Sequence, residues 1–435
     1  MQLRNLAEEP VSDCLHCGLI LVAFVSFTTG TLVHYPVSLM MLLGIAFIWK
    51  KPERECYAAL KFVLLMYFIV WFPMLIATID AVNLTRAVQT TLLYLHFVPV
   101  LVYLVVVGRR EKIRRLVGYG LVALVFFGAV DALVQLTSGQ NFFGYPYSHG
   151  LLTGVFHPKQ RIGLFLAALV PLVLYISQSR EMGKNMQLVL VSLLFVVILL
   201  SLKRSAWLMG LVAVVGYSFI YRKSEWFSFK RAFSFVVIFL FIGGVAFSFS
   251  KPLQKQIHNS FISPFSEVSE IDRASSHRIS LWRTGLKIVS EHWINGIGPR
   301  GYRYIYKDYA SNDDFWMRKG EGGQTHPHLL FLEVGVETGI VGLLSLVLFY
   351  AVLYRVLISP GLDPPGRAFV LCAGVAWLPF NMHMAFYGSY WSTFVWLLLG
   401  FGIAGYQTKE KTSQTKPPAS RTSKPANKEM DMVPR

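Results

Sequence analysis

A pair of basic residues, Lys203 and Arg204, interrupts an otherwise continuous apolar stretch from 186 to 221. An apolar hairpin can turn on glycine, asparagine or serine, so two cations here need another explanation. Arg86 and Arg161 each open an apolar helix, where a cation opposes the helix dipole. Since the arginine fork suits phosphate oxygens, we interpret these residues as lining an anion-binding pocket. Snorkelling to anionic lipid headgroups is the alternative.

Two histidines stand directly before another apolar stretch, in the run Thr325-His326-Pro327-His328. Proline favours the first position of a helix, which predicts that His326 is the cap residue and that His328 lies in the first turn. A helix N-terminus lowers the pKa of a histidine, so we expect His328 to be neutral at pH 7 and able to accept a proton. Both histidines could instead be surface or capping residues.

Glu333 follows His328 by five residues. It could orient a polar group or make a buried structural hydrogen bond. The two histidines could also share a metal, but Asp313 and Asp314 offer no third ligand at helical spacing. We therefore expect neither a metal nor a cofactor.

The cysteines give little support for a metal site. Cys14 and Cys17 have CxxC spacing, but a structural zinc ion takes four ligands. The mixed-charge N-terminus also shows no cleavable signal peptide.

The composition excludes a soluble globular protein and a disordered one. Of the 435 residues, 54% are hydrophobic and only 15% are charged, with a mean hydropathy of +0.49. The net charge of +17 fits a membrane protein, in which Lys and Arg collect on the cytoplasmic side. Nucleic acid is not an expected partner, because no soluble domain could carry a basic face.

The apolar stretches predict an all-α polytopic membrane protein with about twelve transmembrane helices. The predicted spans are 14–31, 35–49, 62–79, 86–107, 116–136, 160–177, 186–202, 206–221, 232–249, 328–357, 367–386 and 388–406. Placing both termini in the cytoplasm puts most Lys and Arg of the short loops on the cytoplasmic side. This orientation turns Arg86, Arg161, Lys203 and Arg204 outward.

Four regions follow from these spans. Residues 1–249 hold helices one to nine, 250–327 form a long outer loop, 328–406 hold helices ten to twelve, and 407–435 form a disordered cytoplasmic tail. The long loop should contain helices near 252–262 and 276–292. In the second, Ile279, Trp282, Leu286 and Val289 recur at helical spacing and should pack the loop onto the membrane domain.

Arg278 shares a helix face with Trp282, while Arg283 falls to one side. The following run, Gly296-Ile297-Gly298-Pro299-Arg300-Gly301, has only a superficial likeness to a phosphate-binding loop. We interpret it as a turn.

Three stretches resemble the bacterial O-antigen ligase and polymerase superfamily. The first is 202–207, similar to the family's Ser-Arg-Gly/Ala run. The second is 277–282 with 295–298, which resembles the family's Arg-x-x-x-Trp and Gly-[IV]-Gly pair. The third is 325–333 with Glu337-Thr338-Gly339, which looks like the His-Asn-x-x-Leu…Glu-x-Gly signature, although Leu329 replaces the usual asparagine.

The resemblance implies a C-type glycosyltransferase architecture in the bacterial inner membrane, with an active site that faces the periplasm. The implied donor is a glycan on undecaprenyl diphosphate, and the implied acceptor is a sugar of lipid A–core. Arg204 and Arg278 would hold the diphosphate and His328 would activate the acceptor hydroxyl.

We assign Arg161 and Arg86 to the diphosphate as well, with His326, Lys203, Arg283 and Glu333 as possible supporting residues. Metal-using members of the broader architecture carry acidic residues in the first outer loop, whereas TTGTLVHYP has none. We therefore expect metal-independent transfer that inverts the anomeric centre.

Alternatives remain at this point. An O-antigen polymerase would use a second lipid-linked glycan as its acceptor, and a protein O-oligosaccharyltransferase would usually have a larger outer C-terminal domain. A transporter of lipid-linked oligosaccharide should show ionisable groups at the bilayer midplane and internal repeats. The spans are almost free of such charges, and no repeat is visible.

Overall fold

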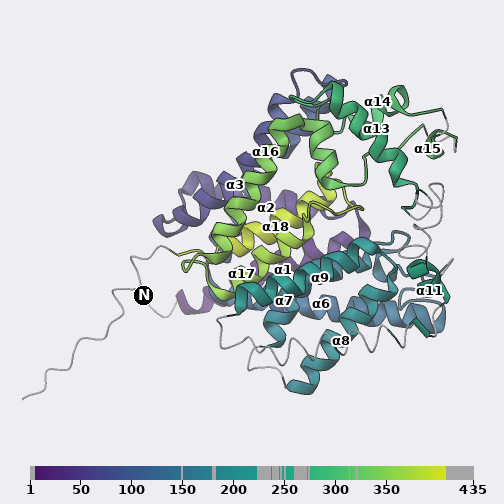
Figure 1. Ribbon diagram of the computed structural model, residues 1–435. Helices are drawn as coiled ribbons and strands as arrows, with labels where there is room; N and C mark the ends of the chain where they lie inside the picture. Colours follow the sequence, from purple (N-terminus) through teal and green to yellow (C-terminus); the bar gives the residue numbers. More distant parts are fainter. Residues whose placement is uncertain are drawn as a thin grey trace, which may run out of the picture.

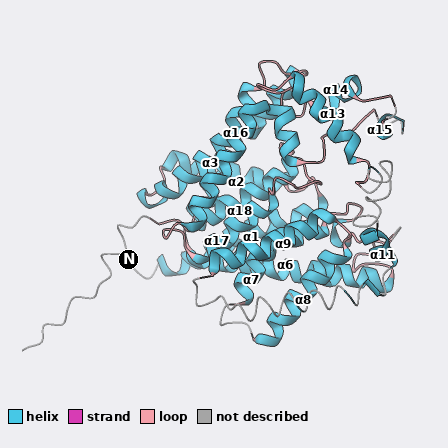
Figure 2. Ribbon diagram, viewed as in Figure 1, coloured by secondary structure: helices cyan, strands magenta, loops and turns pink. Residues whose placement is uncertain are grey.

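The computed structural model describes residues 5–147, 150–178, 183–222, 251–258, 275–312, 314–318 and 322–407, with positions 237, 244, 247, 248 and 272. These residues form helices joined by loops (Figure 2). The prediction of an all-helical protein is therefore confirmed for the described part of the chain. The predicted ninth span, 232–249, and the tail after 407 lie almost wholly outside it.

The described helices follow one another along the chain (Figure 1). They are α1 Asn5–Ser26, α2 His34–Lys50, α3 Tyr57–Ile76, α4 Leu84–Tyr94, α5 Phe97–Gly108, α6 Glu111–Ser138, α7 Ile162–Ser177, α8 Lys184–Leu200, α9 Arg204–Tyr221, α11 Lys251–Ile257, α13 Arg278–Glu291, α14 Tyr302–Tyr309, α15 Phe315–Arg318, α16 Leu330–Ile358, α17 Pro364–Ala376 and α18 Ser389–Ile403.

Six helical stretches are long and apolar enough to cross a membrane. They are Val11–Thr29, Arg54–Ile76, Leu84–Gly108, Glu111–Ser138, Arg204–Tyr221 and Leu330–Ile358. Shorter apolar helices accompany them at His34–Lys50, Ile162–Ser177, Asn185–Leu200 and Ser389–Ile403. The chain is a multi-pass membrane protein, and the count of twelve spans remains a prediction.

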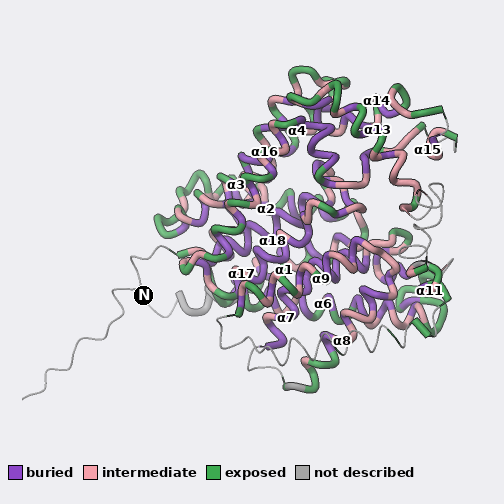
Figure 3. Tube along the Cα trace, viewed as in Figure 1, coloured by how far each residue is buried: buried purple, intermediate pink, exposed green. Residues whose placement is uncertain are grey.

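Helices α7 and α18 form the centre of the protein. Both are apolar around their whole circumference, and nearly every residue of each is buried (Figure 3). Helix α17 packs against both, and α5 lies against α18 on another side. A helix that is apolar all round has to be buried or face lipid, which explains why these two helices take the central positions.

Helix α16 is broken at Gly339, whose φ of 61° and ψ of −155° are not helical. The segment that follows α13 supplies the hydrogen bonds missing at the break. The Trp293 carbonyl accepts from the Ile340 amide at 2.8 Å. A Cβ atom at position 339 would lie 2.3 Å from the Ile294 oxygen. Glycine is therefore required both by the backbone conformation and by this close approach.

The predicted turn at 296–301 is confirmed, since the Gly301 amide donates to the Gly298 carbonyl. The turn is held against α16. The Gly298 amide donates to the Glu337 backbone oxygen at 3.0 Å, and the Arg300 amide donates to the buried Glu337 carboxylate at 2.7 Å. Residues 293–301 and the first half of α16 thus form one hydrogen-bonded unit.

One predicted helix limit is wrong, and one predicted helix face is right only in part, since Trp282 and Val289 of the predicted stripe pack against the buried cluster. Helix α17 ends at Ala376 rather than at 386, because the chain turns back to bond the start of α16 through the Pro379 and Asn381 carbonyls. In α13 the buried face contains Leu281, Thr284, Gly285 and Ile288. Leu286, from the predicted stripe, is 60% exposed. Gly285 lets α13 approach α16 closely, and this places Gly285 rather than Leu286 at the contact.

We expect Gly339→Ala to lower the stability of the purified protein. Alanine would hold a strained backbone and would also displace the Ile294 carbonyl, at a cost of about 3 kcal/mol. Thermal unfolding in detergent measures this change. Gly335→Ala is the matched control in the same helix, because its Cβ would meet Leu343 at an ordinary 3.5 Å. Equal melting temperatures for the two variants would contradict the break at Gly339.

A second prediction concerns Glu337. Replacing it with leucine removes the acceptor of the Arg300 amide, so we expect the free energy of unfolding to fall by about 1–3 kcal/mol. Glu337→Gln keeps an acceptor oxygen of the same size and should lose less than half as much. Thermal unfolding of both variants checks the ordering, and an equal loss would show that the carboxylate does not hold the turn.

Candidate active site

Four segments from distant parts of the chain meet at one end of α9. They are residues 202–205, 275–278, 325–328 and 381–383. Arg204 donates to the Ser276 hydroxyl at 3.1 Å, and the Met382 amide donates to the Ser205 hydroxyl at 3.4 Å. Arg278 contacts the Met382 sulfur at 3.8 Å. The structure therefore brings together Lys203, Arg204 and Arg278, which we call the basic cluster.

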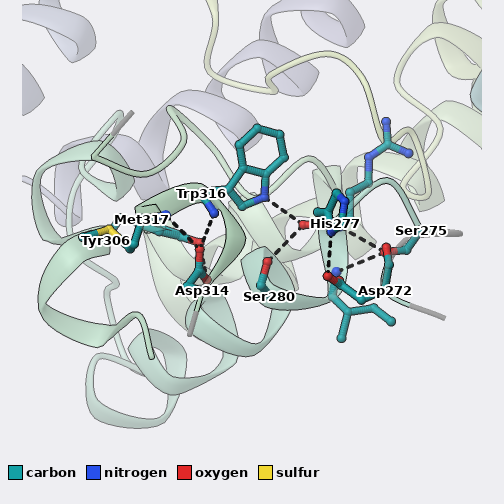
Figure 4. Close-up of polar contacts among 10 residues, drawn as sticks. Asp272, Ser275, His277, Ser280, Tyr306, Asp314, Trp316 and Met317 are labelled. Atoms are coloured by element: carbon teal, nitrogen blue, oxygen red, sulfur yellow. Dashed lines mark hydrogen bonds and ion pairs between the residues drawn. The ribbon is translucent and has the colours of Figure 1, made fainter. Parts of the chain in front are cut away.

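Hydrogen bonds of Ser275, His277 and Trp316 hold the start of α13, from which Arg278 extends. Figure 4 shows the contacts of His277 with Asp272 and Trp316. The Ser275 hydroxyl accepts from the Arg278 amide at 3.0 Å, as helix-capping residues do. His277 pairs with Asp272 at 2.9 Å, and its carbonyl accepts from the Trp316 indole at 2.8 Å. Helix α15, which carries Trp316, thus fixes the direction in which Arg278 leaves the helix.

The basic cluster is crowded with positive charge. Burial, and then the neighbouring Arg204, lower the pKa of Arg278 to about 10. Burial and Arg278 lower the pKa of Lys203 to about 8. Within the described chain, neither Lys203 nor Arg278 forms an ion pair with a carboxylate. A bound anion would relieve this repulsion, so the cluster is suited to a phosphate or a carboxylate.

His328 lies beside the cluster, but not in the first turn of a helix. Helix α16 begins at Leu330, and His328 precedes it in the left-handed region with φ 51°. The expected low pKa nevertheless holds, at about 4. Burial lowers this pKa most, and Arg278 and Lys203 lower it further. A hydrogen bond with the Met382 backbone acts in the opposite direction. The His328 Nδ1 atom is buried without a hydrogen-bond partner.

The helix N-terminus is not available to act on His328 as expected. The Asn381 carbonyl accepts from the Leu330 amide at 3.1 Å, and the Pro379 carbonyl accepts from the Phe331 amide at 3.0 Å. These carbonyls satisfy amides that a helix start leaves without intrahelical partners.

His326 is also not a helix cap. Its ring lies 4.0 Å from the His328 ring, and its Nδ1 bonds with the Thr325 hydroxyl at 3.0 Å. Burial and then His328 lower its pKa well below the usual range. Its Nε2 atom is buried and has no partner.

A cavity of about 360 Å³ adjoins the histidines. Arg86 and Arg161, which the sequence analysis grouped with Arg204 and Arg278, line this cavity and not the basic cluster. The Arg161 guanidinium lies over the Tyr390 ring at 4.0 Å. We call this the arginine cavity; its walls contain Arg86, Arg161, Arg300, His326 and His383, with Tyr94, Phe97, Tyr387, Tyr390 and Trp391 among the aromatic residues.

Sequence reasoning missed two residues of the site, Arg300 and His383. His383 lines the arginine cavity. Burial, Lys203, Arg278, His328 and Arg161, in that order, lower its pKa to about 3, so it is close to cations of both groups. The polar run Asn381-Met382-His383 within a predicted span was the available signal. Arg300 was read only as part of a turn, although its φ of 64° and a cationic side chain mark it as unusual.

Glu333 and Arg283, which the sequence suggested as supporting residues, lie in different surroundings. Glu333 is buried, accepts from the Phe386 amide at 3.0 Å, and lies 4.0 Å from the Arg300 guanidinium. It therefore holds the loop that carries His383. Arg283 is exposed on α13 and lines neither the cluster nor the cavity.

No metal site was expected, and the described residues contain no group of three or more His, Cys, Asp or Glu that could hold one. Asp314 accepts from the Tyr306 hydroxyl at 2.8 Å. Asp313 lies outside the described residues. Cys14 and Cys17 are free, the first exposed and the second buried.

Comparison with known proteins identifies the segment that carries most of this site. Residues 189–347 match the family model described as O-antigen ligase. The matched segment contains Lys203, Arg204, Arg278, Arg300 and His328. A search of curated proteins finds no match. The resemblance to the O-antigen ligase and polymerase superfamily is thus confirmed by the family match over residues 189–347.

Proposed function

We propose that the protein is an O-antigen ligase, which transfers a glycan from undecaprenyl diphosphate to a sugar hydroxyl of lipid A–core and so completes lipopolysaccharide. The observation that carries the proposal is the adjacency of the basic cluster to His328. A cationic site for a diphosphate and a neutral imidazole with a buried, unpartnered nitrogen are the two parts that this reaction needs.

In this mechanism the basic cluster binds the donor diphosphate. Arg204 and Arg278 come from different helices, so they can contact the anion from two directions, and Lys203 adds a third charge. When the bond between the anomeric carbon and the diphosphate oxygen breaks, negative charge develops on that oxygen. Fixed cations stabilise this charge without having to reorganise.

His328 is the general base. Its Nδ1 atom accepts the proton of the acceptor hydroxyl as the hydroxyl oxygen attacks the anomeric carbon. The new glycosidic bond forms on the face opposite the leaving group, so the configuration inverts. The products are the glycosylated acceptor and undecaprenyl diphosphate, and the proton remains on His328 until it passes to solvent.

The distribution of acidic residues among the proposed outer loops supports transfer without a metal. The loop between α1 and α2 holds no Asp or Glu. Asp80 accepts a hydrogen bond from Asn295 at 2.8 Å, which ties the start of the turn 296–301 to the end of α3. Arginine and lysine side chains supply the positive charge in this proposal.

The proposed function also sets the orientation. The site faces the periplasm from the inner membrane, both termini are cytoplasmic, and twelve spans complete a C-type glycosyltransferase architecture. The regions 1–249, 250–327, 328–406 and 407–435 remain our proposed division of the chain.

Transfer by the purified protein tests the function. The protein in detergent is mixed with undecaprenyl-diphosphate glycan and lipid A–core, and the product is followed by gel mobility and mass spectrometry. We expect transfer in excess chelator. Extension of a second lipid-linked glycan instead would identify a polymerase, and activity lost in chelator and restored by a divalent ion would overturn the metal-independent mechanism.

We predict that lysine cannot replace the two arginines of the cluster. Arg204→Lys and Arg278→Lys keep the charge but lose the planar fork, so turnover should fall about tenfold or more, and alanine should cost about 2–4 kcal/mol of transition-state stabilisation. Arg283→Lys, on the exposed side of α13, is the matched control. Full activity of both cluster variants would indicate simple headgroup anchoring.

We predict that His328→Ala lowers turnover about 100-fold or more and leaves donor affinity nearly unchanged. His258→Ala, an exposed histidine, serves as control. Since burial lowers the pKa of His328 to about 4, the imidazole is neutral at pH 7, and the wild-type rate should fall only as the pH drops through about 4. The variant should lack this acid limb. Wild-type turnover by His328→Ala would remove the central residue of the mechanism.

A further inference from the structure

The arginine cavity holds cations that the described structure leaves without carboxylate partners at hydrogen-bond distance. Arg86 donates to the Gln89 amide oxygen at 3.3 Å, and Arg161 lies over the Tyr390 ring. The nearest carboxylate oxygen to the Arg300 guanidinium is that of Glu333, at 4.0 Å. Cations that share a partly buried cavity repel one another, and a bound anion would offset this repulsion.

Two buried polar atoms in the cavity wall also lack partners. They are Arg300 Nη1 and His326 Nε2, and His326 is only 9% exposed. A buried polar group without a hydrogen bond is costly. Oxygen atoms of a bound ligand would satisfy Arg300, and a hydroxyl or acidic oxygen would satisfy His326. The unpartnered atoms of both residues therefore favour a polar, anionic ligand.

The aromatic residues indicate what else this ligand contains. Tyr94, Tyr387, Tyr390 and Trp391 contribute to the cavity wall. Their polar tips are hydrogen-bonded within the protein, so they contribute aromatic surface to the wall. Such a surface suits the apolar face of a pyranose ring. A cavity of this volume is at the lower end of the range for small-molecule sites.

The position of the cavity distinguishes acceptor from donor. Arg161 lines the cavity, whereas Lys203, Arg204 and Arg278 are not among its lining residues. His326, in the cavity wall, has its ring 4.0 Å from the His328 ring. A saccharide in the cavity would therefore lie beside the base, in a space that Arg204 and Arg278 do not line.

We propose that the arginine cavity is an acceptor subsite, which binds an anionic substituent, a phosphate or a carboxylate, on the acceptor saccharide. Arg86, Arg161 and Arg300 bind this substituent, and the aromatic wall binds the adjoining sugar. This assignment rests on the proposed function, and it removes Arg86 and Arg161 from the donor diphosphate site.

The test compares two acceptors that differ only in the anionic group. One lipid-linked core saccharide carries a phosphate, and the other has had it removed enzymatically, both with an uncharged donor glycan. We expect the wild-type kcat/KM to favour the phosphorylated acceptor about tenfold or more. Arg161→Gln and Arg86→Gln should reduce this preference by raising the KM for that acceptor, with the donor KM unchanged.

Lysine variants and a loop control separate charge from packing. Arg161→Lys should keep part of the preference, because it keeps the charge. Lys159→Gln removes an exposed cation from the same loop and should behave as wild type. Equal losses for both acceptors, or a raised donor KM, would overturn the subsite, as would a wild-type enzyme that does not distinguish the acceptors.

A binding measurement does not depend on turnover. Glucose 6-phosphate should bind wild type more tightly than glucose does, in saturation-transfer NMR with the protein in detergent, and Arg161→Gln should abolish the difference. If inorganic phosphate competes as strongly as glucose 6-phosphate does, no sugar is recognised, and the proposal is overturned. If wild type transfers to neither acceptor while glucose 6-phosphate binds selectively, the ligase function fails but the anionic-saccharide site stands.

Discussion

Positive charges gathered at the edge of an apolar layer repel one another, and burial strengthens that repulsion because little water screens it. Much of the structure around the site holds such charges in place. Of the six described non-glycine residues with positive φ, five lie here: Leu202, Ser276, His277, Arg300 and His328. Leu202 and His277 directly precede Lys203 and Arg278. Ser276, Arg300 and His328 have their own side chains at the site. Uncommon backbone conformations of this kind persist only where the surroundings enforce them.

The enforcing contacts come from elements that take no part in the proposed chemistry. Helix α15 anchors the start of α13 through Trp316, and the loop before α18 bonds the start of α16. Glu333 and Glu337 place their carboxylates behind Arg300, where they hold backbone amides on two separate loops. The glutamates thus hold the loops that carry Arg300 and His383 without entering the basic cluster itself.

The sequence predicted the helical membrane fold, the family, and the convergence of Arg204, Arg278 and His328 well, because each rests on local pattern or on motifs. It did not separate Arg86 and Arg161 from the basic cluster, since that depends on how α4 and α7 pack against α18. The sequence did not reveal His383 as a site residue, because it lies in an apolar run that resembles a transmembrane span. The buried face of α13 was predicted only in part because Gly285, which carries no hydrophobic signal, decides how closely that helix approaches α16.

The break in α16 has a consequence for assembly. Four backbone hydrogen bonds around Gly339 join α16 to residues 293–298, outside the helix. An unpaired amide in an apolar layer is costly, so α16 cannot reach its final form until this preceding segment has taken up its position. The segment is also bonded to the loop between α3 and α4, where Val82 donates to the Ile297 carbonyl and Asp80 accepts from Asn295. The final form of α16 therefore depends on an earlier part of the chain, and the turn and the first half of α16 should unfold together.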